Sequence, residues 1–162
     1  RSRVGHGSCF ALRIPLTQPA AAVESTEGRD MTAGGTVLLV GPPTPERDAH
    51  AALLEGWQFT VARADATPAA AAQLADGALP QLVIFDLPDG AAGIAQAIGW
   101  LSRIAGEIGH ELPALFVSSG PVPALGEQPG AAPRLLLARP FRPARLRALI
   151  TRLLAHHDEL PD

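Results

Sequence analysis

The chain has 162 residues, enough for one domain with a core of its own, and with 47% apolar and 18% charged residues it is not a disordered chain. The net charge of −3 and the pI near 5.9 exclude an electrostatic field that would hold it on nucleic acid or on an anionic membrane surface. We therefore expect no nucleic-acid partner and no direct membrane contact.

Residues 1–16 indicate a fragment of a β-hairpin. A turn at residues 5–8 precedes apolar side chains that alternate as in a strand: Phe10, Leu12 and Ile14. The pattern opens at Arg1 with neither an initiator Met nor a signal peptide, so we expect the C-terminal piece of a longer protein.

The single cysteine, Cys9, cannot form an internal disulfide, which favours a cytoplasmic location.

Residues 17–35 have the composition of a linker. Ala, Gly, Thr, Ser and acidic residues dominate this stretch, which cannot bury enough apolar surface to order itself. We expect it to be flexible and to separate the N-terminal fragment from the domain that follows.

Short apolar runs alternate with helical patterns from residue 36 onward. The runs predict strands at 36–40, 59–63, 81–86, 112–118 and 134–138, and the patterns between and after them predict helices at 45–56, 67–77, 92–109 and 143–157. Runs that are apolar on both faces require a buried parallel sheet, so the sequence predicts a five-stranded, doubly wound α/β domain. Residues 119–133 contain four prolines, so the fourth helix is expected to be short, irregular or missing.

Polar residues follow three of the predicted strands. They are Asp86 after the third, Ser118 and Ser119 after the fourth, and Arg139 after the fifth. Ligands of open parallel sheets bind beyond the carboxyl ends of the strands, so these residues are the candidate site.

The stretches LVIFDLPDG, LPALFVSSG and LLLARPF resemble, in order and spacing, the receiver domain of two-component response regulators. The resemblance covers residues 36–157 and implies the flavodoxin-like receiver fold. It implies that Asp86 accepts a phosphoryl group from a kinase histidine and that Ser118 is the switch hydroxyl. Arg139 stands where the family has a lysine and would contact the phosphoryl group. It also implies a cis peptide bond before Pro140.

The N-terminal stretch RSRVGHGSCFALRIPL resembles the closing hairpin of a histidine-kinase ATP-binding domain. Kinase remnant (1–16), linker (17–35) and receiver-like domain (36–157) follow one another as in a hybrid sensor histidine kinase. The resemblance implies a role in two-component phosphorelay signalling, with a histidine kinase or a histidine phosphotransfer domain as partner. The last helix offers a dimer surface as a second use. We expect no catalytic activity of this fragment, whereas its parent would be a histidine kinase.

The chain departs from the family at the first strand. The family places two acids there that hold Mg²⁺, and this chain has Gly41 and Pro42. Asp89 is a doubtful second carboxylate, while Glu46 and Asp48 are expected to face solvent. We therefore expect no cofactor and at most weak Mg²⁺ binding.

These departures favour a degenerate receiver that acts as a regulatory interaction module. The alternative is a working receiver phosphorylated on Asp86. A weaker third reading is a nucleotide-binding regulatory domain that uses the same crevice.

The plainest reading of Asp86 is a strand-end acid that pairs structurally with Arg139. Leu136 occupies the place of the family's switch aromatic, and the histidines show no kinase-type context.

Overall fold

The structure is a computed structural model that describes residues 2–3, 7–8, 35–76, 79–87, 91–119, 125 and 132–157. The chain divides into two units, Arg1–Asp30 and Met31–Asp162. The predicted linker up to residue 34 and most of the predicted kinase remnant lie outside the described residues.

The first unit contains a short antiparallel pair. Strand β1 (Ser2–Arg3) pairs with β2 (Gly7–Ser8), in the register Ser2 to Ser8 and Arg3 to Gly7. Gly7 and Ser8, which the sequence placed in a turn, therefore belong to a strand.

The second unit is built on one five-stranded parallel sheet. Its strands are β3 (Thr36–Val40), β4 (Thr60–Ala64), β5 (Leu82–Leu87), β6 (Ala114–Ser118) and β7 (Arg134–Ala138). They lie in the order β4-β3-β5-β6-β7, and every neighbouring pair is parallel. The predicted fold class, a doubly wound parallel sheet of the flavodoxin-like receiver type, is confirmed.

The described helices are α1 (Pro45–Gly56), α2 (Thr67–Asp76), α3 (Ala91–Ile108) and α4 (Pro143–His157). Thr44 caps α1, because its hydroxyl accepts a hydrogen bond from the backbone N–H of Arg47 at 3.1 Å, and Pro45 begins the helix. The proline-rich stretch between β6 and β7 is described only at its ends and at Leu125. The expectation of an irregular fourth helix therefore lies largely outside the described residues.

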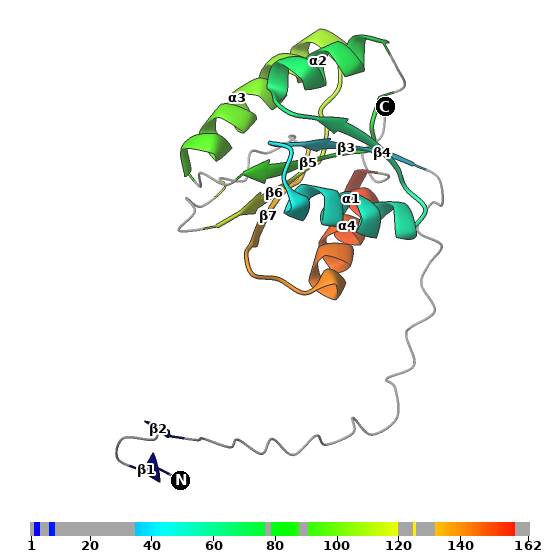
Figure 1. Ribbon diagram of the computed structural model, residues 1–162. Helices are drawn as coiled ribbons and strands as arrows, with labels where there is room; N and C mark the ends of the chain where they lie inside the picture. The colour runs from blue at the N-terminus through cyan, green and yellow to red at the C-terminus, as the bar shows by residue number, and fades with distance from the viewer. Residues whose placement is uncertain are drawn as a thin grey trace. The chain divides into compact units, whose positions relative to one another are not determined.

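The sheet separates two apolar cores. Helices α2 and α3 cover one face and α1 and α4 cover the other (Figure 1). Phe85, Trp100 and Phe116 belong to the core on the α2–α3 face, whereas Ile84 and Ile150 belong to the core on the α1–α4 face. Successive residues of a strand point to opposite faces, so each central strand serves both cores.

No helix among the described residues is long and apolar enough to cross a membrane.

Candidate functional site

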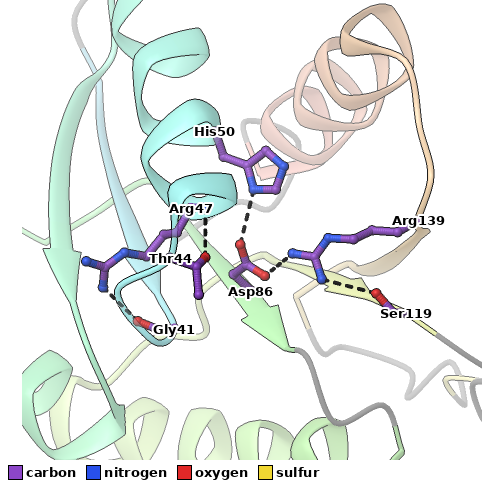
Figure 2. Close-up of polar contacts among 7 residues, drawn as sticks. All are labelled: Gly41, Thr44, Arg47, His50, Asp86, Ser119 and Arg139. Carbon is purple, nitrogen blue, oxygen red and sulfur yellow. Dashed lines mark hydrogen bonds and ion pairs between the residues drawn. The ribbon is translucent and has the colours of Figure 1, made fainter.

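Asp86 lies at the carboxyl end of β5 and is 3% exposed. Both of its carboxylate oxygens accept a side-chain hydrogen bond (Figure 2). The guanidinium of Arg139 donates from Nη2 to Oδ1, and Nδ1 of His50 lies 3.2 Å from Oδ2. An ionised carboxylate can only accept, so Nδ1 of His50 carries the proton. One buried anion is thus held by side chains from α1 and from the residue that follows β7.

His50 reaches the site because it continues the buried stripe of α1. Arg47, Ala51 and Leu54 are buried, and His50 lies at the edge of the same face. A helix that follows a parallel strand begins at the carboxyl edge of the sheet, so the first turns of α1 lie beside Asp86. The imidazole also stacks on Phe141, with ring centroids 5.3 Å apart and planes inclined by 30°.

Arg139 directly follows β7 and joins two strand ends. Its backbone N–H donates to the carbonyl of Ser118 at 2.9 Å, which fixes its start beside β6. Its Nη1 lies 3.5 Å from Oγ of Ser119, and its peptide bond to Pro140 is cis. The guanidinium group of Arg139 therefore lies near the ends of β5 and β6 and points at Asp86.

The two serines at the end of β6 are placed differently. Ser118 is fully buried, and its Oγ has no hydrogen-bond partner among the described residues. Strand alternation places its side chain on the face of Phe116, opposite the face that Asp86 shares with Ile84. The hydroxyl that reaches the Asp86 side of the sheet is that of Ser119.

A small cavity of about 210 Å³ opens beside the Asp86 carboxylate. The residues that line it come from the turn after β3, the first turn of α1 and the ends of β5, β6 and β7: Pro42, Thr44, Glu46, Asp86, Ser119 and Arg139. Asp48 is exposed, as expected. Glu46 is also exposed, yet it borders the cavity and brings a second carboxylate to its rim.

The end of β3 is closed against β5. A Cβ atom on Gly41 would lie 2.5 Å from the carbonyl oxygen of Asp86 and 2.9 Å from its Cβ, both too close for any side chain. Hydrogen bonds hold the turn there: the N–H of Gly41 donates to Ala64 at 2.9 Å, and Arg47 donates to the Gly41 carbonyl at 2.7 Å. Arg47 is itself paired with Asp65 at 2.7 Å. An acid at position 41 has no room in this backbone.

The surroundings of Asp86 hold it in its ionised form. Burial acts to raise the pKa of its carboxyl group, but the hydrogen bonds from His50 and Arg139 and the charges of both side chains outweigh burial. The net result is a pKa below the ordinary carboxyl value of 3.8. Asp86 is therefore an anion at neutral pH whose charge is balanced by protein groups.

The donor set does not fit Mg²⁺, the ion that the receiver resemblance implies. Mg²⁺ needs an octahedral shell of hard oxygen atoms. Gly41 and Pro42 supply no side-chain oxygen, and both oxygens of Asp86 already accept from nitrogen donors. Within the described parts of the chain, no three His, Cys, Asp or Glu side chains gather as metal ligands, and Asp89 lies outside these parts.

Sequence reasoning missed His50 and underused Ser119. The signal for His50 was present, since positions 47, 50, 51 and 54 form one helical stripe that runs toward the carboxyl edge of the sheet. The strand register also favours Ser119 over Ser118. Asp86 pairs with Val117 and Leu87 pairs with Ser118, so Ser118 lies on the opposite face of the sheet from Asp86, and Ser119, one residue later, lies on the same face. The role of Ser118 as switch hydroxyl stays a prediction.

Response regulators and their receiver domains are among the solved structures that are similar to this chain. The N-terminal domain of a response regulator/sensory box/GGDEF three-domain protein from Carboxydothermus hydrogenoformans is 22% identical, with a TM-score of 0.56, covering 76% of this chain and 96% of that one. A response regulator receiver protein from Sinorhizobium medicae is 21% identical, with a TM-score of 0.53 and coverages of 75% and 95%. The response regulator PhyR from Brucella abortus is 20% identical, with a TM-score of 0.60 and coverages of 78% and 50%.

No protein-family model matches the chain, and no curated protein matches it significantly. At these identities, the similarity to solved structures shows that the chain has the receiver fold.

Proposed function

We propose that the chain is a receiver-like module of two-component signalling that acts by binding its partner and not by accepting a phosphoryl group at Asp86. It is the C-terminal module of a hybrid histidine kinase, and its partner is a histidine kinase or a histidine phosphotransfer domain. The observation that carries the proposal is that both carboxylate oxygens of Asp86 already have protein partners, Arg139 and His50.

The paired carboxylate is a poor phosphoryl acceptor. To attack phosphorus, an oxygen of Asp86 must use its remaining lone pair, with its electron density already drawn toward a hydrogen-bond donor, while a phosphodonor brings further negative charge beside it. A bound cation normally offsets that charge, and the residues here do not fit one. Arg139 supplies one positive charge at the site, but its guanidinium group already contacts Asp86 and Ser119.

Two further positions support the proposal. Ser118 faces the α2–α3 core and not the Asp86 carboxylate. Leu136, at the place of the family's switch aromatic, is half-buried and packs against the same core. A leucine has no ring to turn between an inward and an outward position, which supports a module that does not report phosphorylation through this residue.

The hybrid-kinase context is supported by sequence order. The stretch over residues 1–16 resembles the closing hairpin of a kinase ATP-binding domain, and its first residues pair as antiparallel strands. A linker composition and the receiver fold follow in turn.

The cavity argues against the nucleotide-binding reading. Its volume of about 210 Å³ is below the range of roughly 300–1,000 Å³ that drug-sized ligands and cofactors occupy. Two carboxylates, those of Asp86 and Glu46, also line it and would repel a nucleotide phosphate.

The test is phosphorylation by a small phosphodonor. The full chain is incubated with acetyl phosphate, with and without Mg²⁺, and the intact mass is measured beside that of the Asp86→Asn variant. A receiver of known activity serves as the positive control. We expect no Asp86-dependent mass increase and no effect of Mg²⁺. Stoichiometric, Mg²⁺-dependent labelling that is absent from Asp86→Asn would overturn the proposal and establish the working phosphoacceptor.

A further inference from the structure

Helix α4 and the loop before it concentrate positive charge. Residues 139–157 contain five arginines and no acidic residue, although the whole chain has a net charge of −3. The first turn of α4 contains no acid; Arg145 lies in this turn, Arg142 lies directly before it, and Arg147 directly follows it. The N-terminus of a helix carries a partial positive charge, so cations are unfavourable there. Packing of the fold does not explain this arrangement, because these three side chains are exposed.

Three of the arginines form one stripe, which we call the arginine face: Arg142, Arg145 and Arg152. Their spacing, with Leu149 between the last two, places them along one side of the helix. All three arginines are exposed, whereas Leu149 is half-buried against the α1–α4 core. Arg147 lies on the other flank, with its guanidinium carbon 5.9 Å from the ring centroid of Trp57.

Within the described part of the chain, the arginine face has no acidic partner, unlike four arginines elsewhere in the domain. Among described residues 35–139, four arginines form ion pairs, each with an acid from a neighbouring element: Arg47, Arg63, Arg134 and Arg139. No described residue forms an ion pair with any arginine of the face. Arg103 on α3 is likewise exposed and unpaired within the described chain, but it stands alone.

We infer that the arginine face is a docking surface for an acidic helix of a partner protein. The charge calls for carboxylates, and a helix with acids at intervals of three and four residues would lie along the stripe. The half-buried Leu149, which lies between Arg145 and Arg152 on the stripe, adds apolar surface beside the arginines. Apolar contact of this kind suits a protein partner better than a nucleic acid, whose phosphates dominate its binding. The inference goes beyond the proposed function and does not involve Asp86.

The test uses a synthetic peptide as the probe. The peptide has about 20 residues, long enough to be helical in water, and is built from Ala, Leu and Glu, with Glu repeated every three to four residues. Its binding to the full chain is measured by isothermal titration calorimetry at low and at physiological salt. We expect the double variant Arg145→Gln and Arg152→Gln to raise the Kd at least tenfold. We expect the matched control Arg103→Gln to leave it unchanged, and added salt to weaken the wild-type complex.

Several results would overturn the inference. They are no binding of the peptide, an equal loss in Arg103→Gln, and tighter binding of duplex DNA or of phosphatidylglycerol vesicles than of the peptide. Self-association that the double variant abolishes would show that a second copy of the chain occupies the face, which contradicts the stated partner. Circular dichroism confirms that each variant is folded. Because Asp86→Asn leaves the arginine face intact, it should bind the peptide normally, so the inference and the proposed function can fail independently.

Discussion

Two neighbouring strands end at the same edge of the sheet with opposite chemistry. Strand β5 ends in Asp86, a buried carboxylate that accepts from Arg139 and His50, whereas β3 ends in Gly41, which has no room for a side chain. Strand β5 therefore ends in a charged side chain, whereas the backbone of Asp86 leaves no space for a side chain at the end of β3. The difference shows how the same edge of the sheet holds one carboxylate with side-chain donors and leaves no space for a side chain at position 41.

The largest effect is expected at Gly41. Gly41→Ala places a Cβ atom 2.5 Å from the Asp86 carbonyl, so the two strand ends must separate. We expect a loss of about 2–3 kcal/mol in the free energy of unfolding, measured by urea denaturation. The matched control is Gly99→Ala, because Gly99 is exposed within α3 and nothing lies within 4 Å of its Cβ position. That variant should gain about 0.5–1 kcal/mol, and equal effects at both sites would contradict the close approach of β3 and β5.

Asp86→Asn tests the balance of charge at the β5 end. The amide removes the anion while Arg139 and His50 keep their places, so a partly buried guanidinium loses its counter-charge. We expect a loss of about 2 kcal/mol, less than for a fully buried pair because the Arg139 side chain is 21% exposed. Glu107→Gln on the exposed face of α3 is the control and should change stability by less than about 0.5 kcal/mol. Stabilisation by Asp86→Asn would mean that the cost of burying the Asp86 charge exceeds the stabilisation from its contacts with Arg139 and His50.

The pH dependence of stability follows from the lowered pKa of Asp86. The unfolded chain binds the proton more readily than the folded one, so the contribution of Asp86 is fully present above its ordinary pKa of 3.8. It is lost as the pH falls through the lower folded-state pKa. Urea midpoints measured from neutral to acidic pH should fall more steeply for the wild type than for Asp86→Asn. Parallel curves would show that the pairing does not shift the pKa of this carboxyl group.

The smallest effect is expected at the second residue after β3. Pro42 is half-buried and lines the cavity, so Pro42→Asp has room that Gly41→Asp does not. We expect the folded state to change by less than about 1 kcal/mol, as judged by thermal unfolding. A loss as large as that of Gly41→Ala would show that the whole turn, and not one close contact, closes the β3 end.

The sequence was sufficient to predict the fold, and the reason is visible in particular elements. The runs TVLLV and RLLLA become β3 and β7 with the predicted bounds, and the capped stretch that begins at Pro45 becomes α1 as predicted. These signals are local: continuous apolar runs for buried strands, and a Thr-Pro start for a helix. The turn at residues 5–8 was less accurate, because short loops leave the register of a short hairpin open.

The candidate site was predictable only in part. Asp86 and Arg139 follow apolar runs, and their pairing is a consequence of parallel strands ending at one edge. His50 and the closure at Gly41 depend on tertiary distances, such as how near α1 and β3 approach β5, and no local pattern encodes these distances. The sequence showed that acids are missing after β3, whereas the structure shows that an acid would not fit at position 41.

The two tryptophans give each layer of the domain its own spectroscopic reporter. The chain has two Trp and no Tyr, so its near-ultraviolet emission comes from these two rings. Trp100 is 4% exposed in the α2–α3 core, edge-on to Phe85, while Trp57 is half-buried on the other face beneath Arg147. Emission from Trp100 should therefore lie further to the blue than emission from Trp57, and a Trp57→Phe variant would isolate it. Unfolding of the two sheet faces can thus be followed separately without an added label.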